Sequence, residues 1–182
     1  MSKITVTPCE IEGLYVIEPK VFGDNRGYFI ETYNEKEFFE EGLTMKFVQD
    51  NQSKSKKGVL RGMHFQKKHP QGKLVRAISG EVFDVAIDIR KGSKTFGKWF
   101  GVTLSAENKK MFYIPEGFAH GYLVLSEEAE FAYKCTDFYH PEDEGGVYYD
   151  DSDVGIEWPI PEGTEVILAD RDKNWDGIQA LK

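Results

Sequence analysis

The amino-acid sequence predicts an all-β fold, an antiparallel jelly-roll barrel with one or two short helices. Short apolar stretches follow one another along most of the chain, and Gly, Pro, Asn or Asp residues separate them. These stretches do not alternate with helical segments, so the pattern disfavours a parallel βαβ sheet and favours an antiparallel barrel. The sequence contains no internal repeat, low-complexity tract or linker, and residues 1–182 are therefore predicted to form a single domain.

Each predicted element follows from a local pattern. The N-terminal run Ile4-Thr5-Val6 enters a strand directly, and Asn34 can cap a short helix. Glu37 stands three residues after Asn34, as in a capping box, and Gly42 ends the helix. The other strands are predicted at residues 14–17, 28–33, 47–51, 59–63, 73–79, 81–89, 98–104, 110–114, 121–125 and 129–136.

Residues 73–79 and 81–89 form the clearest predicted strand pair, joined at Gly80. In the second of these strands apolar residues fill one face, and Asp84 and Asp88 lie on the other. Such a face borders solvent, a polar cavity or a subunit contact. Solvent is the favoured interpretation for Asp88. For Asp84, solvent is weighed equally against the other two settings taken together.

The last segment, residues 159–182, is interrupted at its start by Pro159, Pro161 and Gly163. It then carries the apolar triplet Val166-Ile167-Leu168. Because an apolar triplet is costly to leave in water, the segment is predicted to pack onto the barrel.

Charge and composition exclude several classes of function. The formal net charge is −8, from 31 acidic and 23 basic residues, which disfavours a nucleic-acid partner. No apolar run approaches the roughly 20 residues that span a bilayer, so no membrane partner is expected. The only cysteines are Cys9 and Cys135, too few for a disulfide framework, and a cytoplasmic location is the default expectation. A few inward-facing Arg or Lys side chains could still hold a small phosphorylated ligand.

The histidines raise the question of a metal site. The four histidines are His64, His69, His120 and His140. The spacing of residues 58–64, and of residues 115–120 later in the chain, resembles the two halves of the cupin signature. Metal-binding cupins carry His-x-His in the first half, but Gln66 replaces the second histidine here. The remaining imidazoles do not complete the three or four ligands that a divalent ion needs, so no metal is predicted.

His64 without a metal becomes a candidate base. An ordinary core histidine is the alternative. The next predicted strand begins with Lys73, and adjacent antiparallel strands would bring His64 and Lys73 to one cavity. A neutral imidazole beside a fixed cation is the pair needed to remove a proton from a carbon next to a carbonyl group.

Seven stretches carry a more specific resemblance. They are FGDNRGYFIE (22–31), FVQDN (47–51), LRGMHFQ (60–66), KLVR (73–76), DVAID (84–88), IPEGFAHG (114–121) and YKCT (133–136). With these motifs, almost end to end, the chain resembles the dTDP-4-dehydrorhamnose 3,5-epimerases of activated rhamnose biosynthesis.

The resemblance implies a cupin-like homodimer without metal or cofactor. Its substrate would be dTDP-4-dehydro-6-deoxy-D-glucose, epimerised at C3 and C5 through C4 enolates to dTDP-4-dehydro-L-rhamnose. His64 would be the base, Tyr133 the acid on the opposite sugar face, Lys73 the enolate stabiliser and Asp172 the carboxylate partner of His64. The implied substrate-binding residues are Arg26, Glu31, Gln49, Asn51, Arg61, His120, Tyr139, Glu144 and Arg171. Tyr139 would stack on thymine, and the segment around Arg26 would reach the site of the partner chain.

Some alternatives stay open at this point. The family pattern Leu-Ser-x-Lys-Asp is Leu168-Ala169-Asp170-Arg171-Asp172 here, so Asp170 is a second candidate for the partner of His64. Residues 148–151 read YYDD where the family often has Trp-Asn-Asp, which leaves local packing and base stacking open. A single-centre epimerase or ketoisomerase of a related dTDP-sugar would use the same chemistry. A non-catalytic sugar-nucleotide-binding cupin and a metal-dependent oxygenase are the alternatives from other classes.

Overall fold

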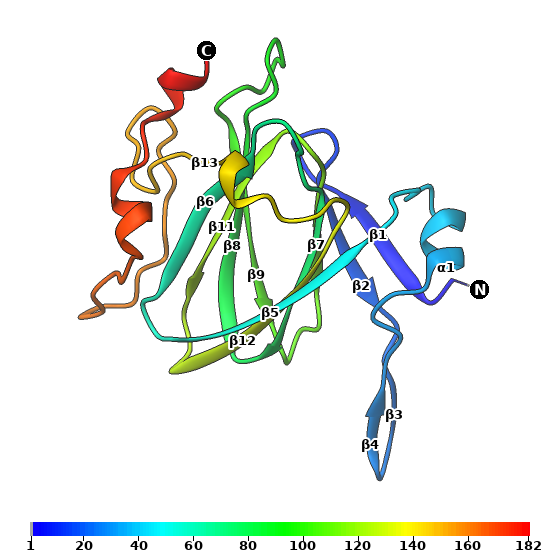
Figure 1. Ribbon diagram of the computed structural model, residues 1–182. Helices are drawn as coiled ribbons and strands as arrows, with labels where there is room; N and C mark the ends of the chain where they lie inside the picture. The colour runs from blue at the N-terminus through cyan, green and yellow to red at the C-terminus, as the bar shows by residue number, and fades with distance from the viewer. Residues whose placement is uncertain (1) are drawn as a thin grey trace.

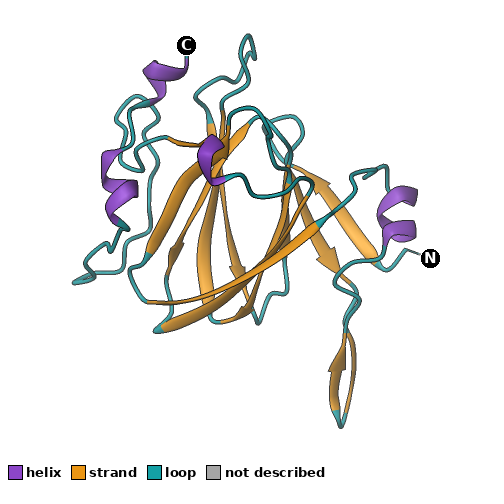
Figure 2. Ribbon diagram, in the orientation of Figure 1, coloured by secondary structure: helices purple, strands orange, loops and turns teal. Residues whose placement is uncertain are grey.

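The computed structural model describes residues 2–182 and confirms the predicted all-β fold. Two antiparallel sheets face each other as a cupin-like barrel (Figures 1 and 2). The strands are β1 (Ile4–Pro8), β2 (Tyr15–Pro19), β3 (Phe22–Asp24), β4 (Gly27–Phe29), β5 (Gln49–Lys56), β6 (Leu60–Gln66), β7 (Lys73–Ser79), β8 (Glu81–Asp88), β9 (Trp99–Ser105), β10 (Met111–Ile114), β11 (Phe118–Val124), β12 (Glu128–Cys135) and β13 (Glu144–Gly146). The helical elements are α1 (Glu35–Glu40) and three short 3-10 turns at Pro141–Asp143, Asp170–Asn174 and Ile178–Leu181.

The sheets differ in strand order and in what covers them. The six-stranded sheet has the order β1-β2-β10-β7-β12-β5, and the five-stranded sheet has the order β13-β6-β11-β8-β9. Alternate side chains of both sheets point inward and meet in one core, which includes Val75, Ala86 and Phe131. On the other face of the five-stranded sheet, Met63 packs with Ile178 of the C-terminal segment. In the part of the chain described, no helix is long and apolar enough to cross a membrane.

Helix α1 begins where the sequence predicts. The Asn34 side chain accepts hydrogen bonds from the backbone N–H groups of Lys36 and Glu37, and Gly42 follows the helix with a positive φ of 81°. The capping-box role of Glu37 is not seen. Its carboxylate instead accepts the backbone N–H of Lys3 at 3.0 Å and so ties the helix to the start of β1.

Most predicted strands are confirmed to within a few residues, and 73–79 is matched at both ends. The first correction is at 28–33, because β4 ends at Phe29 and pairs with β3 as a separate hairpin. The second is at 47–51, because β5 extends to Lys56. This strand reads QDNQSKSK, and a polar strand leaves no hydrophobic pattern to detect. It is fixed by its pairing with β12 along its whole length.

The predicted pairing of 73–79 with 81–89 is wrong. Strand β7 belongs to the six-stranded sheet and β8 to the five-stranded sheet. Gly80 therefore lies at a corner between the two sheets and not in a hairpin turn. Its φ is +71°, and a Cβ atom there would collide with the carbonyl oxygen of Glu128. The corner therefore requires glycine for two reasons, backbone conformation and close approach.

The solvated interpretation of Asp88 is also wrong. Its side chain is fully buried, and it accepts hydrogen bonds from Arg90, Ser93 and Thr95 at 2.6–2.9 Å. These donors lie two to seven residues further along the chain, so the loop after β8 folds back over its own aspartate. Although burial opposes it, these bonds lower the pKa of Asp88 to about 2.

The C-terminal segment packs onto the barrel, as the apolar triplet predicts. The backbone of Ile167 donates to the carbonyl oxygen of Gly58 at 2.9 Å and accepts the N–H of Leu60 at 3.0 Å. This attachment lies at the start of β6, and the turn that follows carries Asp172 toward the middle of that strand.

Candidate active site

A cavity of about 370 Å³ opens between the two sheets. Strand β6, strands β7 and β12 of the opposite sheet, and the C-terminal segment all contribute to its wall. The predicted site residues that line it are Arg61, His64, Lys73, His120, Tyr133, Arg171 and Asp172. The four predicted catalytic residues therefore share one cavity.

His64 and Asp172 form a hydrogen-bonded pair in this cavity. The His64 Nε2 and Asp172 Oδ1 atoms are 2.7 Å apart, and the His64 side chain remains 19% exposed. A carboxylate can only accept, so Nε2 carries the proton in the neutral ring and Nδ1 is left with a free lone pair. Asp170, the other candidate partner, is 98% exposed and pairs with Lys173.

The Asp172 carboxylate is held from three directions. Trp175 Nε1 donates to the same oxygen at 3.1 Å, and the Gly62 backbone N–H donates to the other at 3.4 Å. Burial alone would raise the pKa of Asp172, but the bonds from His64, Trp175 and Gly62 outweigh it and lower the pKa. The pair thus places a charged carboxylate behind an imidazole that faces open space.

Lys73 reaches the cavity from the sheet opposite His64. The prediction that His64 and Lys73 lie on adjacent strands is wrong, because β7 pairs with β10 and β12 and not with β6. The two side chains line the same cavity from facing sheets. Burial lowers the pKa of the Lys73 amine, while the charges of Cys135, Asp84 and Glu144 act in the opposite direction.

Tyr133 lies on β12, which pairs with the strand of Lys73, β7; Tyr133 is opposite Val75, and Lys73 is opposite Cys135. Burial raises its pKa to about 12. Its hydroxyl group is therefore protonated at neutral pH and can donate a proton.

A second histidine–aspartate pair lies in the wall of the barrel. His120 Nε2 is 2.9 and 3.0 Å from the two carboxylate oxygens of Asp84, and Asp84 is completely buried. Of the alternatives for Asp84, solvent is therefore excluded. Burial raises the pKa of Asp84 and lowers the pKa of His120.

Gln49, Asn51, Tyr139 and Glu144 are not among the residues that line this cavity; they make polar contacts with one another or with Arg171, which does line it. Gln49 Nε2 donates to Asn51 Oδ1 at 3.1 Å, and Gln49 Oε1 accepts the backbone N–H of Tyr139 at 3.0 Å. Arg171 Nη1 and Glu144 Oε2 form an ion pair at 2.5 Å. Although burial opposes it, the contacts with Tyr139, Glu144 and Asp172 raise the pKa of Arg171.

Arg26 and Glu31 are not brought to the cavity. Arg26 lies at the turn of the β3–β4 hairpin, where it pairs with Asp24 and is 85% exposed. Glu31 pairs with Lys3 at 3.0 Å. Figure 1 shows this hairpin projecting away from the barrel.

Sequence reasoning missed two residues that support the site. Trp175 bonds to Asp172, and its ring lies edge-on to the His64 ring with centroids 6.3 Å apart. Asp84 fixes His120. The signal for Asp84 was an acidic residue on one face of a strand whose other face is apolar, and Trp175 had none beyond its closeness in sequence to Asp172.

The position where cupins carry a second histidine has a different use here. Gln66 donates through Nε2 to the carbonyl oxygens of His69 and Phe138, and it accepts the N–H of His140 through Oε1. Within residues 2–182, no group of three or more His, Cys, Asp or Glu side chains is arranged to hold a metal ion.

Comparison with known proteins gives a consistent result. A family model described as dTDP-4-dehydrorhamnose 3,5-epimerase matches residues 8–180. The epimerase of that name from Methanothermobacter thermautotrophicus is 54% identical over 179 residues, covering 98% of this chain and 97% of the relative. The one from Shigella flexneri is 56% identical over 94% of both chains.

A solved structure agrees with the sequence relatives. It is the dTDP-6-deoxy-D-glucose-3,5-epimerase of Legionella pneumophila in complex with dTDP-4-keto-L-rhamnose. The two folds superpose with a TM-score of 0.94 at 51% identity, covering 98% of this chain and 95% of the other. On the family match, the identities and this likeness, the chain belongs to the dTDP-4-dehydrorhamnose 3,5-epimerase family.

Proposed function

We propose that the protein epimerises dTDP-4-dehydro-6-deoxy-D-glucose at C3 and C5, giving dTDP-4-dehydro-L-rhamnose for dTDP-L-rhamnose biosynthesis. The observation that carries the proposal is the pair of His64 and Asp172 in a cavity that also holds Lys73 and Tyr133. Membership of the family supports both the substrate and the two centres.

The four side chains have complementary roles in this reaction. His64 Nδ1 removes the proton at C5, and later at C3, each time next to the C4 ketone. Lys73 stabilises the negative charge that develops on the C4 oxygen. Tyr133 returns a proton from the opposite sugar face, which its position on the facing sheet supports. Asp172 sets the tautomer of His64 and stabilises the imidazolium form.

The predicted binding residues suit a nucleoside diphosphate. The guanidinium groups of Arg61 and Arg171 can each pair two phosphate oxygens. Tyr139 offers a half-exposed aromatic face for the thymine base. The remaining proposed contacts are made by Gln49, Asn51, His120 and Glu144. No metal or cofactor takes part in these steps, and activity is expected to survive chelation.

We further propose a homodimer in which residues 1–182 of each chain act as one domain, with a cytoplasmic location. The β3–β4 hairpin leaves Phe22, Tyr28 and Phe29 exposed by 43–63%, an apolar surface that a second copy would cover. The same contact would carry Arg26 and Glu31 to the cavity of the partner. Phe29→Asp is expected to give monomers in light scattering. Ile160→Asp changes an exposed residue of the C-terminal segment and is expected to leave the dimer intact.

Deuterium incorporation tests the catalytic proposal. The purified protein is incubated with the keto-sugar in D₂O, with and without chelator, and the label is located by NMR. Label is expected at both C3 and C5. Label at one centre alone would indicate a single-centre epimerase or ketoisomerase, and dTDP binding without any label would indicate a non-catalytic binder.

A further inference from the structure

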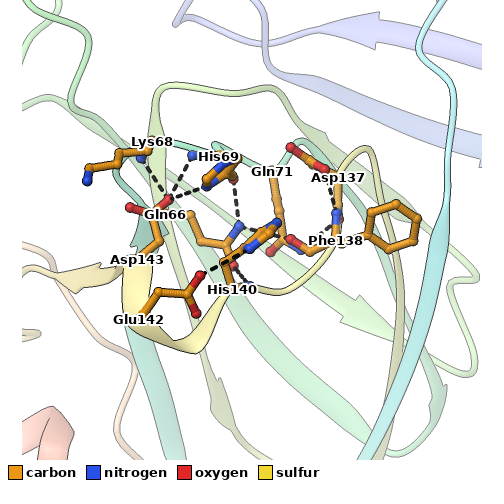
Figure 3. Close-up of polar contacts among 9 residues, drawn as sticks. All are labelled: Gln66, Lys68, His69, Gln71, Asp137, Phe138, His140, Glu142 and Asp143. Carbon is orange, nitrogen blue, oxygen red and sulfur yellow. Dashed lines mark hydrogen bonds and ion pairs between the residues drawn. The ribbon is translucent and has the colours of Figure 1, made fainter.

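Gln66 holds two loops together at the mouth of the barrel. It is buried, and it lies two residues after His64 on β6. Its Nε2 group donates to the carbonyl oxygen of His69 at 2.6 Å and to that of Phe138 at 3.1 Å, and its Oε1 atom accepts the N–H of His140 at 2.7 Å (Figure 3). One amide thus bonds to the residues on both sides of Tyr139.

A second amide holds Tyr139 itself. Gln49 begins β5, on the opposite sheet from Gln66, and its Oε1 atom accepts the Tyr139 N–H at 3.0 Å. Three consecutive residues, 138–140, are therefore bonded to side chains from both sheets. The Tyr139 side chain makes none of these bonds and remains 47% exposed beside Arg171, which lines the cavity.

The surrounding contacts make the two loops one unit. The Asp143 carboxylate accepts the backbone N–H groups of Lys68 and His69, both at 2.7 Å. The rings of His69 and His140 stack with centroids 4.1 Å apart. Figure 3 shows Gln66 in the middle of this network.

We propose that Gln66 is a positioning residue for nucleotide binding. By bonding to Phe138 and His140, it fixes the backbone on each side of Tyr139 and so presents the Tyr139 ring to the base. An aromatic side chain that is already oriented loses less conformational entropy when the ligand binds. This inference rests on the proposed function, because it takes Tyr139 to contact the nucleotide.

Gln66→Met tests the inference, because it keeps the size of the side chain and removes all three hydrogen bonds. The KM for the keto-sugar nucleotide and the Kd of dTDP are each expected to rise about tenfold. The kcat value is expected to stay within about twofold of wild type, since uniform binding is lost and not transition-state binding. The matched control is Gln71→Met. It removes one amide-to-carbonyl bond, to Asp137 of the same loop, and is expected to change KM by less than about threefold.

A double-mutant cycle separates positioning from general loop stability. If Gln66 acts through Tyr139, Gln66→Met costs less than about twofold in dTDP affinity once Tyr139→Ala is present. Additive losses, or a Gln66→Met enzyme with wild-type KM and Kd, would overturn the inference.

A second variant covers the case in which Gln66→Met does not fold. Gln66→Glu keeps the acceptor for His140 and sets a carboxylate against two carbonyl oxygens. Its KM is expected to exceed that of wild type and to recover as pH falls, because a protonated carboxyl regains a donor. A KM that does not depend on pH would overturn the inference.

Calorimetry with dTDP needs no turnover, so an inactive wild-type protein that binds dTDP would refute the epimerase assignment and leave the test of Gln66 intact.

Discussion

Two histidine–aspartate pairs on the adjacent strands β6 and β11 are made of the same two residue types but are placed differently. His64 pairs with Asp172 of the C-terminal segment and keeps 19% of its side chain exposed, whereas His120 pairs with Asp84 of the neighbouring strand and keeps 7%. Hydrogen bonds lower the pKa of Asp172, and burial raises the pKa of Asp84. The residue types are the same in both pairs. The comparison therefore teaches that the exposure of the histidine and the hydrogen-bond donors around the carboxylate decide which pair can exchange a proton with a ligand.

The sharpest contrast between the pairs is expected from removing each imidazole. His64→Asn should lower kcat by about 10³-fold, because the variant lacks the imidazole that removes the proton. His120→Asn should lower kcat by about tenfold or less. Both are measured as epimerisation followed by NMR. Equal losses in the two variants would mean that the pairs are not functionally distinct.

The carboxylates provide the next contrast. Asp172→Asn should lower kcat by about 10²-fold, because an amide neither stabilises the imidazolium nor enforces the tautomer. Asp170→Asn, two positions away and exposed, is the matched control and should keep wild-type kcat. A loss at Asp170 similar to that at Asp172 would reassign the partner of His64.

The wall pair should affect stability more than turnover. Asp84→Ala leaves a buried imidazole without its acceptor and should lower the free energy of unfolding by about 2 kcal/mol. Urea unfolding followed by circular dichroism measures this change. A variant as stable as wild type would show that the pair contributes nothing to holding the barrel together.

The smallest expected difference is in pH dependence, where the aspartates have opposite signs. The pKa of Asp172 is lowered from 3.8, so its contribution to stability is present above that value and is lost as pH falls through the lower folded-state pKa. The pKa of Asp84 is raised from 3.8, so its ionisation costs stability as pH rises above 3.8. Urea unfolding from pH 3 upward should therefore show Asp172→Asn and Asp84→Asn changing the slope in opposite directions. If the two variants changed the slope of stability against pH in the same direction, the opposite pKa shifts of Asp172 and Asp84 would be contradicted.

The sequence predicted the barrel well because its inner strands alternate clearly, and it predicted poorly where polar groups are satisfied at a distance. Strand 73–79 was matched at both ends, but the partner of β7 could not be read from its own residues. Asp88 was misassigned to solvent because its donors come from a loop and leave no periodic signal. The strand predicted at residues 47–51 was too short because the polar sequence of β5 also leaves no periodic signal.

The site was predicted by resemblance more than by geometry. Reasoning from adjacent strands brought His64 and Lys73 to one cavity, although they lie on facing sheets. The choice between Asp170 and Asp172 needed the structure, since both are acidic residues of one short turn. Arg26 and Glu31 pair with Asp24 and Lys3 away from the cavity, so their place in the site rests on the proposed dimer.

The bond between His64 and Asp172 joins residues 108 positions apart. Closing so long a loop costs more entropy than pairing strands that follow each other closely in sequence, such as β8 and β9, so we expect this contact to form late during folding. A refolding chain should therefore regain its sheet signal before it regains turnover. The recovery of catalytic activity then measures when the C-terminal segment docks onto the barrel, which is the last step of folding.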